Sequence, residues 1–140
     1  MIFLDTSVLI AIAQVSHERH KPSRELWKQC SWHSAAISTH TIAELYNTLT
    51  AMPPVMRLAP RDAALAVETF LQRLTPVTLT ADEYVETLRR TANLGRSGGI
   101  INDALHLVCA LKIEAERIYT WNVKHFQMAA PDLAERIVTP

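Results

Sequence analysis

Four short polar islands interrupt the apolar segments of this 140-residue chain, and three of them carry a carboxylate. Burying a carboxylate in apolar surroundings is costly unless the group is hydrogen-bonded, paired or bound to a metal. A fold that gathers three carboxylates also gathers their charge, and a divalent cation removes that repulsion. The islands are Asp5-Thr6-Ser7 after residues 1–4, Glu44 within 41–45, Asp103 within 98–105, and Thr120-Trp121-Asn122. This pattern predicts an acidic magnesium or manganese site.

Apolar strands and amphipathic helices alternate along the chain. Residues 2–4 show no polar alternation, which is typical of a strand buried on both faces of a parallel sheet. Further strands are predicted at 35–37, 77–79 and 118–120, with an edge strand at 137–138. Helices are expected from residue 8 and over 22–30, 40–52, 60–74, 81–94, 100–115 and 122–126. This alternation predicts an α/β fold with a mainly parallel sheet of four to five strands, in a single domain spanning 1–140.

Composition excludes several classes of protein. Formal net charge is zero, so the strong basic excess of many nucleic-acid-binding proteins is missing, although a local basic rim remains possible. The six histidines form no HExxH pair or Cys/His cluster, so zinc is not expected. Cys30 and Cys109 are expected to be buried thiols in a reducing compartment. No targeting or membrane-spanning segment is evident, which predicts a cytoplasmic protein.

Each carboxylate also has a purely structural explanation. Asp5 could cap the helix that follows it. Thr41 and Glu44 match a capping box, unless the helix begins near Ser38, which would free Glu44 to face a cleft. Asp103 is hardest to explain this way, because it lies in the most apolar helix of the chain.

Other polar residues near these islands are ambiguous. Asn122 is a common turn residue, but its amide oxygen can also bind a hard cation. Ligands of parallel sheets sit beyond the carboxyl ends of the strands, where Asp5 and Asn122 fall. A lone histidine on an apolar helix is more often hydrogen-bonded core, so His106 is left out of the predicted site.

In this order the islands resemble the PIN domain, the metal-dependent nuclease fold of many type II toxin–antitoxin toxins (VapC-like). The motifs that carry the resemblance are Ile2-Phe3-Leu4-Asp5-Thr6-Ser7, Ala43-Glu44-Leu45, Asp103-Ala104-Leu105-His106-Leu107 and Thr120-Trp121-Asn122-Val123-Lys124-His125-Phe126. The resemblance covers the whole chain. It implies a three-layer α/β/α fold and a small ribonuclease that forms a homodimer and is neutralised by a cognate antitoxin protein.

The resemblance also implies roles for individual residues. Asp5, Glu44 and Asp103 match the three acidic positions of the family's metal site, which implies Mg²⁺, with Mn²⁺ able to substitute. Many members have a fourth acid where this chain has Asn122, and others have asparagine. Ser7 and Thr120 match polar positions that hydrogen-bond ligands or water.

A mechanism follows as a hypothesis. Asp5 and Asp103 would bind the metal directly, and Glu44 would bind directly or through water and orient or deprotonate the attacking water. Metal-activated water would then cleave the phosphodiester in line. Arg96, in a glycine-rich loop, is the first candidate for binding the RNA phosphates, before Arg89, Arg90 and Lys124. Single-stranded or loop RNA is the expected substrate because its bases and backbone are accessible.

Rival functions are separated by particular residues. A haloacid dehalogenase-type phosphatase needs a second Asp two residues after Asp5, where this chain has Ser7. A response-regulator receiver needs an acidic pair after the first strand, which is missing. The alternative that stays open is a non-catalytic PIN-like module that binds RNA or protein. For the antitoxin, the expected surface is the apolar helical region 53–74.

Overall fold

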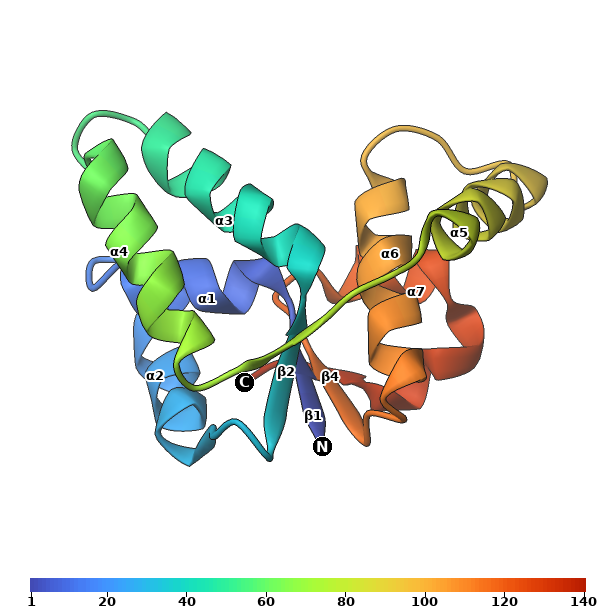
Figure 1. Cartoon of the computed structure of the whole chain (residues 1–140), viewed down its shortest axis with the longest axis horizontal. Helices are drawn as coiled ribbons and strands as arrows, with labels where there is room; N and C mark the ends of the chain where they lie inside the picture. Colours follow the sequence, from blue (N-terminus) through green and yellow to red (C-terminus); the bar gives the residue numbers. More distant parts are fainter.

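A five-stranded, entirely parallel sheet forms the centre of the molecule (Figure 1). The structure is a computed structural model and describes residues 1–140. The strands are β1 (Ile2–Leu4), β2 (Ala35–Ser38), β3 (Thr75–Val77), β4 (Arg117–Tyr119) and β5 (Ile137–Val138), in the spatial order β3-β2-β1-β4-β5. The predicted mainly parallel sheet is therefore confirmed.

Helices cover both faces of this sheet. Helices α1 to α4 lie on one side and α5 to α7 on the other, which gives three layers (Figure 1). The first group is α1 (Thr6–Ala13), α2 (His20–Gln29), α3 (Thr39–Ala51) and α4 (Pro60–Leu71). The second group is α5 (Ala81–Asn93), α6 (Ile100–Lys112) and α7 (Val123–Ala129), and a 3₁₀ helix follows at Pro131–Arg136. No helix combines the length and apolar character needed to cross a bilayer.

Strand β1 explains why the layers form. Successive side chains of a strand point to opposite faces, so Phe3 packs into the core beneath α5 to α7 and Leu4 packs into the core beneath α1 to α4. Both side chains are fully buried. Burying a side chain of this size contributes about 1.5–3 kcal/mol. An apolar strand without alternation can therefore be stable only at the centre of a sheet covered on both faces.

Strand β3 begins two residues earlier than predicted. It spans Thr75–Val77 and pairs with β2, whereas the sequence favoured 77–79 because of Val77 and Leu79. The difference arises at Pro76, which cannot donate to a sheet ladder and counts against a strand on sequence grounds. Because β3 is the edge strand, its outer side needs no donor and Pro76 is tolerated there.

The topology places the functional candidates at one edge of the sheet. All five strands run in the same direction, so the residues that follow β1, β2 and β4 meet at their common carboxyl edge. Asp5 follows β1, Ser38 ends β2, and Thr120 follows β4. Helix α3 starts directly from Ser38 and carries Glu44 over this edge, while the first turn of α6 carries Asp103.

Candidate active site

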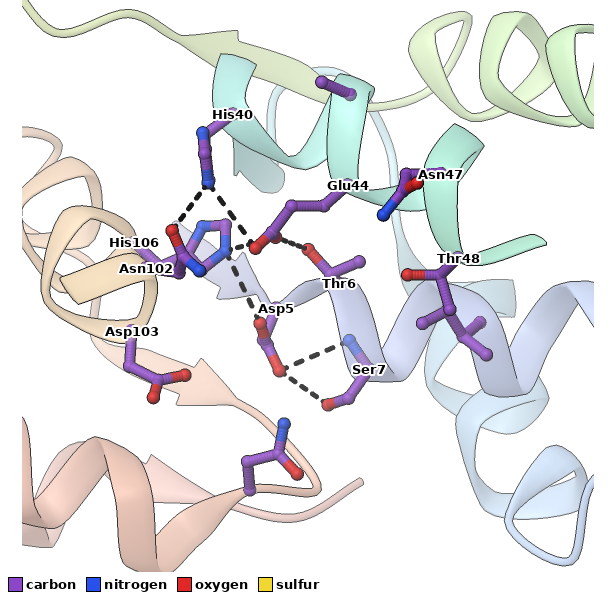
Figure 2. A pocket seen from close by; sticks show the side chains of 13 residues that line it. Asp5, Thr6, Ser7, His40, Glu44, Asn47, Thr48, Asn102, Asp103 and His106 are labelled. Carbon is purple, nitrogen blue, oxygen red and sulfur yellow. Dashed lines mark hydrogen bonds and ion pairs between the residues drawn. The ribbon is translucent and has the colours of Figure 1, made fainter. Parts of the chain in front are cut away.

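A cleft of about 490 Å³ opens at the carboxyl edge of the sheet, between α1, α3 and α6. Figure 2 shows Asp5, Glu44 and Asp103 entering it from three different elements. Residues 5, 44 and 103 are thus brought into one pocket, as the sequence predicts. The polar side chains that line it are Asp5, Thr6, Ser7, His40, Glu44, Asn47, Thr48, Asn102, Asp103, His106 and Asn122.

Asp5 both caps a helix and lines the cleft. The residue is 3% exposed, and one carboxylate oxygen, Oδ2, accepts from the Ser7 amide at 3.3 Å, from Ser7 Oγ at 2.6 Å and from Thr120 Oγ1 at 2.8 Å. The other oxygen, Oδ1, accepts none of these hydrogen bonds and lies 3.8 Å from His106 Nε2. The capping and functional interpretations of Asp5 are therefore compatible, because each uses a different oxygen.

Glu44, like Asp5, has one carboxylate oxygen held by hydrogen bonds and one that is not. Its Oε2 accepts from Thr6 Oγ1 at 2.6 Å and from His106 Nε2 at 2.8 Å, whereas Oε1 has only His40 Nε2 at 3.5 Å. Burial acts to raise the pKa of Glu44, but the hydrogen bond and charge of His106, with Thr6, outweigh it and hold the pKa below its usual value. Glu44 is therefore a carboxylate with one oxygen fixed and one directed to the cleft.

His106 links this carboxylate to the core. The ring is 1% exposed, and its Nδ1 lies 2.8 Å from Ser38 Oγ while Nε2 donates to Glu44. Burial opposes protonation of the ring, yet the hydrogen bond to Glu44 and the charges of Asp5 and Glu44 raise the pKa of His106 above its usual value. His106 is both a hydrogen-bonded core residue, as the sequence indicates, and a wall of the cleft.

Asp103 is the one acid of the three whose carboxylate accepts no hydrogen bond from another side chain. Its side chain is 14% exposed, and the Nδ1 atom of His125 lies 3.9 Å from Oδ2. Burial raises the pKa of Asp103 to about 6, and the negative charge of Asp5 adds to the effect. Asp103 is therefore a carboxylate whose negative charge its neighbours offset only in part.

Ser7 and Thr120 hold the two sides of the site together. Ser7 Oγ donates to Asp5 and accepts from the Trp121 amide at 3.0 Å, while Thr120 Oγ1 donates to Asp5 and accepts from the Asn122 amide at 2.9 Å. Each hydroxyl is thus used as donor and acceptor, which joins the start of α1 to the end of β4. Both residues orient Asp5, and Thr120 is buried.

We expect Thr120→Val to lower the free energy of unfolding by about 1–3 kcal/mol, because it removes a donor from Asp5 and leaves the Asn122 amide without its acceptor. Chemical denaturation of the metal-free protein measures the change, with the exposed Thr139→Val as the matched control. Equal stability of the two variants would contradict a structural role for these hydrogen bonds.

The remaining predicted residues occupy different places. Asn122 lines the cleft and precedes α7. Arg96 lies exposed in the loop between α5 and α6, and its side chain does not line the cleft. The adjoining recess is lined instead by Ser97 and Gly99 of that loop, together with Asp103 and His125.

The donor set suits a hard divalent cation in charge and ligand type. Asp5 and Glu44 each direct one oxygen free of strong hydrogen bonds toward a cleft that already contains the partly offset charge of Asp103. Such oxygens are the ligands that Mg²⁺ and Mn²⁺ prefer. As the side chains lie, no three acidic, histidine or cysteine side chains are grouped closely enough to hold one ion. Binding would therefore require the side chains to draw together.

Sequence reasoning missed three contributors to the site, namely Thr6, His40 and His106. Thr6 and His106 hold Glu44 from 38 and 62 positions away in the chain, so no local spacing could reveal either contact. His40 does leave a local signal, because it stands four residues before Glu44 on α3 and such pairs share a helix face.

Comparison with known proteins agrees with this geometry. The family model described as "PIN domain" matches residues 2–130. The chain belongs to the PIN domain family. A curated relative, ribonuclease VapC27 of Mycobacterium tuberculosis, is 34% identical over 114 residues, covering 81% of this chain and 79% of the relative.

Solved structures share the PIN fold. The crystal structure of M. tuberculosis VapC20, described as a sarcin-ricin loop cleaving toxin, aligns with a TM-score of 0.72 at 19% identity, covering 89% of this chain and 92% of that one. VapBC-1 from nontypeable Haemophilus influenzae aligns with a TM-score of 0.67 at 23% identity, covering 99% and 98%. The predicted three-layer α/β/α fold is therefore confirmed.

Proposed function

We propose that this PIN domain is a metal-dependent endoribonuclease that cleaves single-stranded or loop RNA. The observation that carries the proposal is the cleft itself, where Asp5 and Glu44 each have one oxygen fixed and one free, facing the partly offset charge of Asp103. The name of VapC27 as a ribonuclease and the description of VapC20 as an RNA-loop cleaving toxin support the choice of RNA.

Each acidic residue of the cleft has its own role in the proposed reaction. Asp5 Oδ1 and Asp103 would hold Mg²⁺ or Mn²⁺ directly, and Glu44 Oε1 would bind it directly or orient the attacking water. When bound, the ion lowers the pKa of water and neutralises charge on the scissile phosphate. Thr6 and His106 keep Glu44 Oε2 occupied, so Oε1 is the oxygen that faces the reaction. Asn122 keeps a neutral amide at the cleft, which limits the negative charge there to three acids.

Cleavage of a fluorescent single-stranded RNA tests the proposal. We expect cutting with Mg²⁺ or Mn²⁺, none with EDTA, and loss of cutting in Asp5→Asn. The control is Asp82→Asn, which changes an exposed acid of α5 outside the cleft and should keep full activity. Asp5→Asn retains a side chain that can accept the Ser7 and Thr120 hydrogen bonds, so the variant should fold.

The alternative is a non-catalytic module that binds RNA or protein on the same fold. It predicts no cutting of any RNA and no heat of Mn²⁺ binding in calorimetry. Metal-dependent cleavage that disappears in Asp5→Asn would exclude it.

We also propose that the protein is the toxin of a type II toxin–antitoxin pair, acting in the cytoplasm as a homodimer. The description of VapC20 as a toxin and the shared fold with VapBC-1 support this assignment. An open apolar groove between α1, α2 and α4 includes Leu58, Leu65 and Phe70 of the region predicted to meet the antitoxin. Co-purification with the product of an adjacent gene, and its inhibition of cleavage, would test the pairing.

A further inference from the structure

A second groove lies beside the acidic cleft, and its charged side chains are basic instead of acidic. It is lined by Arg19, Trp121, Asn122, Lys124 and His125, with Val123 and Thr139, and we call it the Trp121 groove. The acidic cleft cannot attract a polyanion by itself, and the chain has no net charge to do so. Cations next to the cleft would attract RNA, and this groove supplies two of them, Arg19 and Lys124.

The two cavities are adjacent. Asn122 lines both the acidic cleft and the Trp121 groove. His125 lines the groove and also the recess that contains Asp103 and Glu44. A strand whose phosphate lies among the carboxylates therefore enters the Trp121 groove with its neighbouring nucleotide.

Trp121 is fixed in a way that suits stacking. Its indole N–H donates to Ser23 Oγ at 2.9 Å and its backbone amide donates to Ser7 Oγ at 3.0 Å, so both the ring and the backbone of Trp121 are held. The guanidinium of Arg19 lies over the ring, 4.9 Å from its centroid. Unpaired bases stack on aromatic rings and on guanidinium planes. The pair therefore forms a platform that is held in place before any base arrives.

The cations beside this platform are available to phosphate. No ion pair holds the exposed Lys124, and Arg19 has only the exposed Glu18, 3.3 Å away. Most exposed cations of a protein are simply solvated. Lys124 and Arg19 differ from the others because they share one groove with a fixed tryptophan and an edge of the acidic cleft.

We propose that the Trp121 groove binds the nucleotide adjacent to the scissile phosphate of single-stranded RNA. The base stacks on the Arg19 guanidinium that covers the Trp121 ring, and the flanking phosphate meets Lys124. This inference rests on the proposed nuclease function, because it takes the acidic cleft as the position of the scissile phosphate.

Fluorescence anisotropy with a labelled single-stranded RNA in EDTA tests the groove without cleavage. We expect Lys124→Gln to weaken binding and to reduce the slope of log affinity against log salt by about 0.7, the value for one phosphate contact on a single strand. Trp121→Leu should weaken binding roughly tenfold for the single strand and leave a duplex of the same sequence unaffected. The control is Arg117→Gln, an exposed cation that begins β4 and so lies at the opposite edge of the sheet.

The outcomes separate this inference from the nuclease proposal. Equal affinity and salt slope in Lys124→Gln, Arg117→Gln and wild type would overturn the proposed role of the groove in RNA binding. A wild-type protein that binds no RNA would overturn it too. Equal losses for single strand and duplex in Trp121→Leu would overturn the stacking role. If the groove variants lose RNA binding but wild type never cuts RNA with Mg²⁺ or Mn²⁺, the groove stands as an RNA-binding site and the nuclease proposal fails.

Discussion

Asp103→Asn is expected to lower RNA cleavage about a thousandfold and, without metal, to make the protein more stable at neutral pH. A catalytic ion supplies several kcal/mol to the transition state, and about 4 kcal/mol corresponds to about a thousandfold in rate. Asp103 is the acid whose charge its neighbours offset only in part. Removing this charge should therefore lower the rate of cleavage and raise the free energy of unfolding in the same variant.

The sign of the stability effect follows from the pKa. Burial raises the pKa of Asp103 from 3.8 to about 6 in the folded protein, with Asp5 adding to it. The folded state then binds the proton more tightly than the unfolded state, so ionisation costs stability. That cost is absent below about pH 4, develops between pH 4 and 6, and is complete above pH 6. At pH 7 it amounts to at most about 3 kcal/mol.

Thermal melts of the metal-free protein at pH 4 and pH 7.5 measure this effect. We expect Asp103→Asn to melt several degrees above wild type at pH 7.5 and level with it at pH 4. Added Mn²⁺ should raise the melting temperature of wild type and not of the variant. A lower melting temperature for Asp103→Asn at pH 7.5 would contradict the predicted electrostatic cost.

His106→Leu is expected to weaken Mn²⁺ binding and cleavage by about 10- to 100-fold, the usual effect of losing a residue that orients a ligand. His106 does not need to touch the ion. It donates to Glu44 Oε2 while its far nitrogen is held by Ser38, which fixes where Glu44 Oε1 points. His106→Gln keeps a donor near the same position and should recover part of the loss.

A double-mutant cycle shows whether His106 acts through Glu44. Calorimetry with Mn²⁺ would compare His106→Leu in the wild-type background and in Glu44→Gln. Coupled residues have non-additive effects, so the histidine change should matter little once Glu44 is altered. The exposed His33→Leu is the control. Fully additive losses would show that His106 affects binding by another route, such as general loosening of the core.

The sequence was sufficient for the architecture because the central strand β1 and the alternation of helices and strands are clear in it. An apolar β1 buried on both faces, followed by regular helix and strand alternation, allows few folds other than a covered parallel sheet. The bounds of the edge strand β3 differ from the prediction because Pro76 counts against a central strand and is tolerated in an edge strand. Helix α3 was placed well, since Ser38 accepts from the Thr41 amide and Glu44 lies beyond the capping position.

The residues of the acidic cleft were predictable only in part. Burial made Asp5 and Asp103 conspicuous, because a carboxylate in an apolar segment needs an explanation. The oxygens left free could not be predicted, because they depend on donors such as Thr6 and His106 that arrive from other elements. Metal dependence, the RNA contacts of Arg96 and the homodimer remain predictions.

The position of β1 in the sheet sets an order of events during protein synthesis. The strand that is made first lies in the middle and needs β4 beside it, and Asp5 receives a hydrogen bond from Thr120, 115 residues later. A chain emerging from the ribosome therefore holds Asp5 and Glu44 long before it holds Asp103 or the strand that orients Asp5. Translation that stops anywhere before Thr120 leaves a product without the hydroxyl that donates to Asp5 and without Asn122 of the cleft.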